Sequence, residues 1–211
     1  MLIAITGGIG SGKSVVSQAL RVMGYPVYDC DSRAKWVMTH DPLLRQQLTE
    51  LFGAETYLAD GSLNKPHLSA AIFGHAEALA QMNACVHPAV ARDLEKQYLE
   101  HLTNEQNSLT ESKENTPFFF ESAILFESGF DKLSSPDQVW TISAPLELRI
   151  SRAMERDNAS RQQILSRIES QMAQEEKENR ANHVIWNDSE HSVLAQIREI
   201  LKNCTNQENN K

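Results

Sequence analysis

The sequence predicts an α/β fold built around a parallel β-sheet, and three observations support this. The first 31 residues have the pattern of a strand, a glycine-rich loop, a helix and a second strand, which together form one right-handed βαβ unit. Helical patterns then fill residues 32–102. From residue 117 onward strand and helix patterns alternate again, as they do when helices connect neighbouring parallel strands.

The composition is that of an acidic globular protein. The 211 residues include 20 Lys and Arg against 28 Asp and Glu, which gives a net charge of −8. An acidic chain is a poor ligand for nucleic acid or an anionic membrane, so we expect neither as a partner. We expect no secretory signal, because no basic segment precedes the first apolar residues. Three scattered cysteines are typical of a reducing compartment, so we expect a cytoplasmic location.

The first βαβ unit can be assigned residue by residue. Leu2–Ile5 is predicted as a short buried strand. Apolar side chains recur at helical spacing from Val15 to Met23, and Gly24 ends that helix. Residues 25–31, YPVYDCD, are predicted as the second strand, which ends in two acidic residues.

The middle of the chain is predicted as a helical insertion. Asp41 precedes Pro42, a pairing typical of an N-cap followed by proline in the first helical turn. His87 and Pro88 are interpreted in the same way, as the start of another helix. Residues 103–116 are polar and predicted as a surface connection. The predicted helices cover residues 32–40, 41–53, 65–74, 76–86 and 87–102.

The last third of the chain returns to alternating elements. Strands are predicted at residues 117–127, 138–143 and 183–188, and helices at 145–157, 160–180 and 192–203. Residues 204–211 are predicted as a flexible tail. Four aromatic residues are expected in the core: Trp36, Phe73, Phe126 and Trp140.

The loop after the first strand carries the clearest chemical signal. GGIGSGKS matches the phosphate-binding pattern G-x-x-x-x-G-K-[ST] with Gly7, Gly12, Lys13 and Ser14. Glycines allow backbone N–H groups to surround an anion at the start of a helix. The lysine adds a positive charge for the β- and γ-phosphates, and the serine hydroxyl is a suitable Mg²⁺ ligand. The sequence therefore predicts a nucleotide triphosphate site.

This motif fixes phosphate binding but leaves the reaction open. A GTPase would need N-K-x-D, whereas NKPH begins at Asn64 and has His67 in place of the aspartate. A small chain with a helical insertion and a later arginine-rich helix favours a small-molecule kinase. No pair of histidines has metal-ligand spacing, so we expect Mg²⁺ to bind with ATP rather than in a site built by the protein.

Seven segments, the phosphate-binding loop among them, resemble one kinase family. ITGGIGSGKS, YDCDSRAK, CVHPAV, AILFE, RAMERD, RIESQ and VIWND follow one another as in bacterial dephospho-CoA kinases, over residues 2–201. The resemblance implies transfer of a phosphoryl group from ATP to the ribose 3′-hydroxyl of dephospho-CoA. It also implies a three-layer P-loop kinase core with a parallel five-stranded sheet, a helical substrate-binding insertion and a lid.

The resemblance implies a division of the chain. Residues 1–31, 117–145 and 183–203 are expected to form the nucleotide-binding core. Residues 32–116 are expected to form the acceptor domain, and residues 146–182 the lid with its adjoining helices. We expect a monomer or a weak homo-oligomer.

Site residues follow from the motif and the resemblance together. Asp31 could orient the acceptor hydroxyl and take its proton, although a carboxylate there could instead cap the next helix. His87 is an acceptor-contact candidate. Arg152 and Arg156 share a helix face and could hold phosphate oxygens, although salt bridges with neighbouring acids are the alternative. Arg149, Arg161 and Arg167 are nearby candidates that the sequence cannot rank. Asn187 resembles the family's asparagine near adenine, or it shapes a turn.

The expected roles can be grouped. Asp31, Lys13 and Arg152 are the expected catalytic residues, and Ser14 is the expected protein ligand of Mg²⁺. The expected nucleotide-binding residues are Gly8, Gly10, Ser11, Gly12, Lys13, Ser14, Val15, Arg156 and Asn187.

Four positions depart from the family pattern: Val15, Lys65, Ala123 and Asn182. They stand where threonine, arginine, proline and aspartate are common. Lysine lacks the bidentate geometry of arginine, so the acceptor side is the more affected. Two other functions remain open at this point. One is a kinase for another nucleoside or nucleotide, and the other is a non-catalytic module that senses nucleotide.

Overall fold

The structure, a computed structural model, describes residues 1–106 and 116–208. Most of the predicted connection at residues 103–116 and the last three residues of the predicted tail lie outside this range. The chain divides into two compact units. The first comprises Met1–Tyr28 with Glu105–Lys211, and the second comprises Asp29–Asn104.

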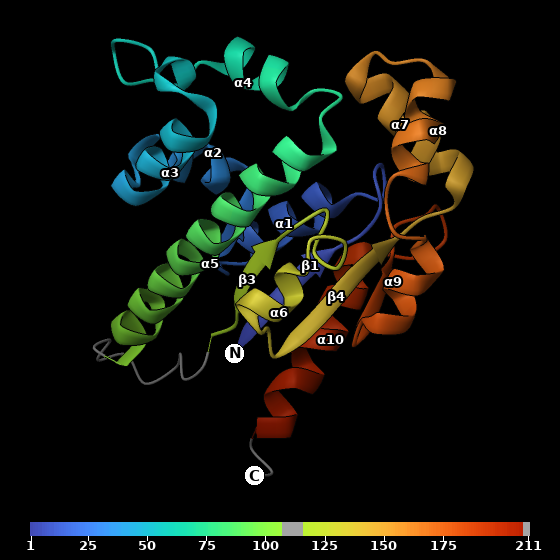
Figure 1. Cartoon of the computed structure of the whole chain (residues 1–211). Coiled ribbons are helices and arrows are strands. Elements are labelled where there is room, and N and C mark those ends of the chain that lie inside the picture. Colours follow the sequence, from blue (N-terminus) through green and yellow to red (C-terminus); the bar gives the residue numbers. More distant parts are fainter. Residues whose placement is uncertain (107–115, 209–211) are drawn as a thin grey trace. The chain divides into compact units, whose positions relative to one another are not determined.

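Five parallel strands form the sheet of the first unit, as the sequence predicts. The order is β2-β3-β1-β4-β5 (Figure 1). β1 pairs with β3 on one side and with β4 on the other, so the strand order reverses beside β1. Ligands bind in such sheets beyond the carboxyl ends of the strands at this reversal. The strands are β1 Leu2–Thr6, β2 Val27–Asp29, β3 Phe118–Glu121, β4 Gln138–Ser143 and β5 His183–Trp186.

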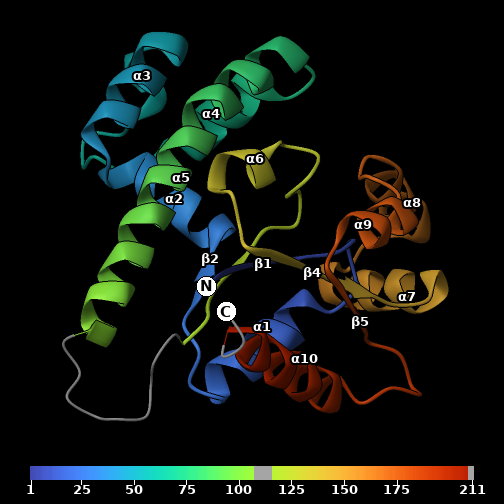
Figure 2. The same cartoon turned by 90° about the horizontal axis from the view of Figure 1, so that it is seen from below.

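Helices cover both faces of the sheet. α1 (Lys13–Val22) and α10 (Val193–Glu208) lie side by side on one face (Figure 2). Phe119 faces these helices within a buried apolar cluster. Its neighbour Phe120 points to the other face, where its ring lies 6.0 Å from that of Phe130 in α6 (Phe130–Ser134). α9 (Gln174–Arg180) packs beside β4. Apolar side chains on alternate sides of the strands therefore produce the three layers.

α7 (Leu146–Asp157) and α8 (Arg161–Glu169) form a helical hairpin after β4. Asn158 ends α7 in the left-handed conformation with φ 48°, a conformation that asparagine tolerates. Ser160 and Gln163 form a capping box that starts α8. The two helices share a small apolar cluster formed by Ile150, Ala153 and Ile164.

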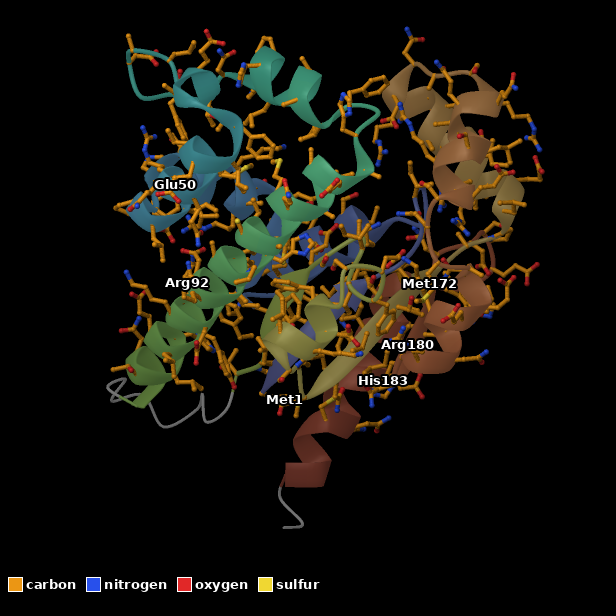
Figure 3. All side chains as sticks on the ribbon, viewed as in Figure 1. Met1, Glu50, Arg92, Met172, Arg180 and His183 are labelled. Atoms are coloured by element: carbon orange, nitrogen blue, oxygen red, sulfur yellow. The ribbon has the colours of Figure 1, made fainter. Side chains whose placement is uncertain are left out.

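The prediction of one helix over residues 160–180 is wrong. α8 ends at Glu169 and α9 begins at Gln174. Between them the N–H of Met172 donates to the carboxylate of Glu127 at 3.0 Å, so a distant acid replaces a bond within the helix. Figure 3 shows Met172 and Arg180 close together at this break, where Arg180 lies 4.0 Å above the Phe126 ring. Tertiary contacts therefore interrupt a segment with good helical composition.

The second unit is helical, as predicted for the insertion. It contains α2 Cys30–His40, α3 Pro42–Phe52, a short 3-10 helix at Ala54–Thr56, α4 Lys65–Ile72 and α5 Ala76–Gln106. The predicted cap at Asp41 is confirmed, since its carboxylate accepts hydrogen bonds from the N–H groups of Leu43 and Leu44.

The prediction that a new helix starts at His87 and Pro88 is wrong. α5 continues through both residues and is 31 residues long. Proline removes the bond that its own N–H would donate to residue 84, which normally weakens or bends a helix. The helix continues because Val86, Ala89, Val90 and Leu94 are all buried on one face.

The expectation that four aromatic residues lie in the core is half right. Trp140 and Phe126 are buried, but Trp36 is 44% exposed and Phe73 is 87% exposed. The Trp36 ring stacks on that of His40 with centroids 4.5 Å apart, and the Arg33 guanidinium lies 4.1 Å from the Trp36 ring. α2 instead buries Val37 and Met38, so its aromatic residue lies on the polar face.

α10 extends beyond the boundary predicted at residue 203. The helix continues to Glu208, and the Cys204 side chain is buried in the apolar cluster beneath the sheet. That burial stabilises a polar segment that would otherwise fray. Within residues 1–106 and 116–208, no helix combines the length and the apolar character needed to cross a bilayer.

Candidate nucleotide-binding site

The loop between β1 and α1 has the backbone that the sequence motif requires. Gly7, Gly10 and Gly12 have φ values of 147°, 73° and 97°, which side chains disfavour. The loop follows the carboxyl end of β1 and leads directly into α1, where the first N–H groups of the helix point toward the loop. The strand, loop and helix predicted from the sequence are thus confirmed, and they form the setting of an anion site.

Close approach by other segments also demands glycine in this loop. A Cβ atom at Gly8 would collide with the guanidinium of Arg149, and one at Gly10 would collide with the backbone carbonyl of Arg149. A Cβ atom at Gly12 would meet the side-chain amide of Asn187. The loop is therefore packed tightly against α7 and against the residues that follow β5.

Lys13 places its charge directly over the loop. Its Nζ donates hydrogen bonds to the carbonyl oxygens of Gly7 at 2.9 Å and Gly8 at 3.3 Å. The adjacent Ser14 is exposed at the start of α1. A mobile cation beside a helix N-terminus can bind the outer phosphates of a triphosphate.

The residues around Ser14 fit a Mg²⁺ ion that arrives with ATP. Ser17 lies one turn after Ser14 on the same face of α1, and its Oγ donates to Glu121 Oε2 at 2.6 Å. Glu121 ends β3, the strand beside β1. Hydroxyl and carboxylate oxygens are the donors that Mg²⁺ prefers. In the described residues, no group of three or more His, Cys, Asp or Glu could hold a metal, so these oxygens would need phosphate oxygens to complete the coordination.

Glu121 was missed by the sequence reasoning, although a signal was present. Three phenylalanines precede it, and all three are buried in the strand. An acid that directly follows a fully buried parallel strand must lie at the edge of the sheet where ligands bind.

Arg149 is the arginine that touches the loop. Its Nε donates to the carbonyl of Ile9 at 3.1 Å, and the side chain is buried with only 5% of the residue exposed. Burial lowers the pKa of Arg149, and the carboxylates of Glu175 and Glu178 oppose that shift. An arginine remains protonated under such conditions, so it brings a fixed positive charge to the loop.

Arg152 and Asn187 join the end of β5 to the same loop. Asn187 Nδ2 donates to the carbonyl of Ser11 at 2.9 Å, and Asn187 is buried. Arg152 Nη1 donates to the carbonyl of Asn187 at 3.0 Å. The structure therefore brings together two residues that are 35 positions apart, and Asn187 contacts the end of the loop at Ser11.

The other arginines of this region form ion pairs with acids. Arg156 makes a bidentate pair with Asp157, which also binds Arg167. Arg161 pairs with Glu147. The alternative that the sequence left open for Arg156, a salt bridge with a neighbouring acid, is therefore present in the structure. The Arg161–Glu147 and Arg167–Asp157 pairs fasten α8 to α7 at the exposed side of the hairpin.

In the second unit, Asp29 and not Asp31 caps α2. The Asp29 carboxylate accepts from the N–H groups of Asp31 at 3.0 Å and Ser32 at 3.2 Å. Asp31 lies exposed in the first turn of the helix. The capping role that could have explained Asp31 is thus performed by its neighbour.

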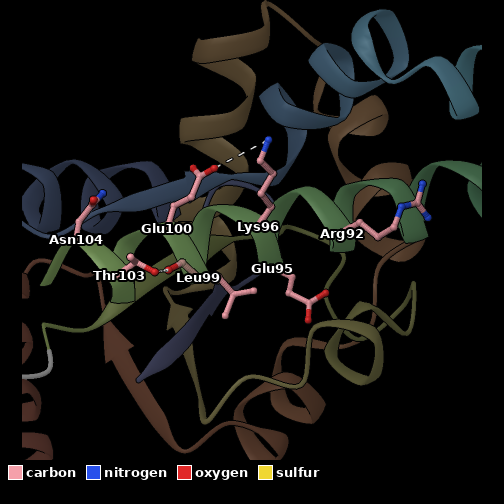
Figure 4. A pocket seen from close by; sticks show the side chains of 7 residues that line it. All are labelled: Arg92, Glu95, Lys96, Leu99, Glu100, Thr103 and Asn104. Atoms are coloured by element: carbon pink, nitrogen blue, oxygen red, sulfur yellow. Dashed lines mark hydrogen bonds and ion pairs between the residues drawn. The ribbon is translucent and has the colours of Figure 1, made fainter. Parts of the chain in front are cut away.

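His87 lies within α5 and is half-buried. Burial lowers the pKa of its imidazole. A groove of about 730 Å³ runs along the same helix from Arg92 to Asn104, and the described residues that line it all belong to α5 (Figure 4). Its lining combines acids with bases, including the Lys96–Glu100 pair, and contains no predicted site residue.

Three departures from the family pattern can be located in the structure. Asn182 Oδ1 accepts from the N–H of Val139 at 2.7 Å, a contact for which either an amide or a carboxylate oxygen serves. Ala123 offers its carbonyl to Lys177 Nζ at 3.1 Å, which does not depend on the side chain. Lys65 is exposed at the start of α4, where Asn64 caps the helix.

Comparison with known proteins identifies the family that the chain resembles. A sequence profile described as dephospho-CoA kinase matches residues 1–192. A dephospho-CoA kinase from Bacteroides fragilis is 44% identical over 199 residues, covering 94% of this chain and 90% of that protein.

Solved structures show the same fold. A protein from Thermus thermophilus aligns with a TM-score of 0.75 and 33% identity, covering 95% of both chains. The dephospho-CoA kinase from Campylobacter jejuni aligns with a TM-score of 0.66 and 22% identity, covering 98% of both chains, and supports the fold alone. With its profile match and its identity to the Bacteroides protein, the chain belongs to the dephospho-CoA kinase family.

Proposed function

We propose that this chain transfers the γ-phosphoryl group of ATP to the ribose 3′-hydroxyl of dephospho-CoA, giving coenzyme A and ADP. The single observation that carries the proposal is the loop of residues 7–12, which leads into α1 and lies under the Lys13 ammonium, in a chain of this family. The N–H groups at the end of the loop and the positive end of α1 bind the phosphates.

Four residues in or near the loop have roles in the proposal. Lys13 leaves the carbonyls of Gly7 and Gly8 to bind the outer phosphates, which offer a stronger charged acceptor. Arg152 stabilises the negative charge that develops on the transferred group. Asn187 holds the loop at Ser11 while the adenosine part of ATP binds nearby. Arg156 contributes less, because Asp157 already neutralises it.

Asp31 orients the acceptor in this proposal. The 3′-oxygen forms a bond to the γ-phosphorus while the bond from that phosphorus to the bridging oxygen breaks, and ADP leaves. The proton of the hydroxyl passes to the Asp31 carboxylate. His87 contacts the acceptor substrate. Ser14 would hold Mg²⁺ together with phosphate oxygens, and the ion would supply positive charge that neutralises the triphosphate.

The domain roles follow from the same argument. Residues 32–116 bind the acceptor, and residues 146–182 form a lid that excludes water from the transferred phosphoryl group. The enzyme acts in the cytoplasm as a monomer or weak homo-oligomer. The scattered cysteines support that location.

An acceptor panel tests the function. The protein is incubated with Mg·ATP and, separately, dephospho-CoA, AMP, CMP and free nucleosides, and ADP formation is measured. We expect rapid turnover with dephospho-CoA and little with the others. Lys13→Ala is the matched variant, and it should lose most turnover. Preferred phosphorylation of another acceptor would contradict the proposed substrate, and ADP formation that does not need Lys13 would contradict the proposed site.

A further inference from the structure

Ile9 is the third residue of the loop of residues 7–12. Its N–H group, its carbonyl group and its side chain each contact another part of the chain. Its N–H donates to Gln171 Oε1 at 2.8 Å, and its carbonyl accepts from Arg149 Nε at 3.1 Å. Its side chain packs against the apolar cluster of α7 and α8. Every one of these contacts comes from residues 149–171, far away in the sequence.

The neighbouring peptide is held in the same way. The N–H of Gly8 donates to Gln174 Oε1 at 3.1 Å. The Gln174 amide is itself oriented, because its Nε2 donates to the carbonyl of Ile142 in β4 at 3.4 Å and to Glu178 Oε1 at 3.3 Å. Glu178 also accepts from Ser143 Oγ at 2.6 Å. The Nε2 and the Oε1 of Gln174 therefore each have defined partners, which fix the orientation of the amide.

The position of both glutamines depends on the break between α8 and α9. Gln171 follows the end of α8, and Gln174 starts α9. One uninterrupted helix would place residues 171 and 174 on nearly the same face, one turn apart. The break instead lets both amide oxygens reach successive N–H groups of the loop.

From these contacts we infer that Gln171 and Gln174 are positioning residues for nucleotide binding, which hold the Gly8–Ile9 peptides so that the rest of the loop is preorganised for phosphate. A glycine-rich loop without such support must be ordered when the ligand binds, which weakens affinity. The two glutamines need not touch the nucleotide. Their effect passes through Ile9 and Gly8, and it joins the α7–α8 hairpin to the phosphate site.

This inference rests on the proposed nucleotide site, and the test separates the two. Gln171→Met keeps the length of the side chain but removes the acceptor oxygen. Removing one hydrogen bond to an ordered loop should weaken binding about tenfold. We therefore expect the dissociation constant for ADP and the inhibition constant for tripolyphosphate to rise by that factor. At saturating ATP, kcat and the KM for dephospho-CoA should stay near those of the parent.

Three further variants complete the experiment. Gln162→Met, on the exposed face of α8, is the matched control and should bind ADP like the parent. Ile9→Ala should weaken ADP binding. In the double variant Ile9→Ala, Gln171→Met, the dissociation constant for ADP should rise by much less than the product of the two separate fold-increases, because both substitutions act on the contacts of one residue. Lys13→Ala reports on the nucleotide site itself.

Amide exchange provides a readout that does not depend on activity. In the nucleotide-free protein, the N–H of Ile9, which donates to Gln171, should exchange slowly in the parent and at least tenfold faster in Gln171→Met. Parent-like exchange and parent-like ADP affinity in Gln171→Met would overturn the inference. If Lys13→Ala still lost ADP binding, the nucleotide site would stand without it. If Lys13→Ala bound ADP normally, the site itself would be wrong.

Discussion

Lys177 Nζ lies 2.5 Å from Glu127 Oε1, and the lysine side chain is fully buried. The same ammonium donates to the carbonyl of Ala123 at 3.1 Å. Burial lowers the pKa of Lys177, and the Glu127 carboxylate opposes that shift. The pair fastens α9 to the turn after β3, and α9 carries the glutamine that holds Gly8. An ion pair on one side of the sheet thus supports the phosphate loop.

Loss of the Glu127 charge should destabilise the fold. Glu127→Gln leaves a buried ammonium without its counter-charge, and breaking a buried pair in this way costs about 3 kcal/mol of unfolding free energy. Lys177→Met in the same chain removes that unpaired charge and should recover much of the loss. Urea unfolding of the two single variants and the double variant measures both effects. Equal stability of Glu127→Gln and the parent would show that the pair contributes nothing.

A methyl group on Gly10 should be far more damaging than one on Gly24. Both glycines have positive φ, 73° and 92°, so alanine strains either backbone by roughly 1–2 kcal/mol. Only at Gly10 does the new Cβ meet the backbone of Arg149, whereas no atom lies within 4 Å at Gly24. The clash should add roughly 1–3 kcal/mol.

The two alanine variants are compared by urea unfolding and by ADP titration. Gly10→Ala should also lose ADP affinity, while Gly24→Ala should keep it. If both variants lost the same stability, the packing of α7 on the loop would have no energetic consequence, contrary to the geometry.

Asp31 and Asp29 should separate into a catalytic and a structural role. Asp31→Asn removes the carboxylate that takes the proton, so kcat should fall by roughly 10²–10⁴-fold with ATP affinity retained. Asp29→Asn keeps an amide oxygen that can cap α2, so turnover should stay within about tenfold of the parent. Steady-state kinetics with both substrates measures this. The reverse pattern would assign the proton transfer to Asp29.

His183 should make stability depend on pH. Burial lowers its pKa below the ordinary value of 6.5, and its ring lies 6.0 Å from that of Trp140. At a pH below 6.5 the unfolded chain binds a proton that the folded chain does not. The free energy of unfolding should therefore fall as the pH falls from about 7.5 to 5.5. The burial of His87 acts in the same direction.

His183→Gln should therefore reduce the slope of Tm against pH without abolishing it. His75→Gln, at an exposed position, is the matched control. A slope in His183→Gln as steep as that of the parent would mean that this histidine is not the cause.

The phosphate loop could be predicted from the sequence because its signal is local. Gly7 to Ser14 are consecutive, and the strand and helix beside them are strongly patterned. The partners of the loop could not be predicted. Gln171 lies 162 residues from Ile9, and nothing local distinguishes it from other polar residues of a helical segment. Arg149 likewise could not be ranked above the neighbouring arginines, because only the packing of α7 reveals which one faces inward.

The missed helix boundaries have the same cause. Proline at position 88 is a sound local signal for a helix start, but burial of the surrounding apolar face outweighs it. The sequence from Ser160 to Arg180 has helical composition, yet long-range contacts of Met172 and Gln171 break it. Local propensity identifies elements, and tertiary contacts decide where they end.

The most direct measurement is a calorimetric titration of ADP, with Mg²⁺, into the parent and into Lys13→Ala. We expect one site per chain in the parent, competition by ATP, and a large loss of affinity when the lysine is removed. Absence of binding to the folded parent, or undiminished binding to Lys13→Ala, would contradict the assignment of this loop as the phosphate site.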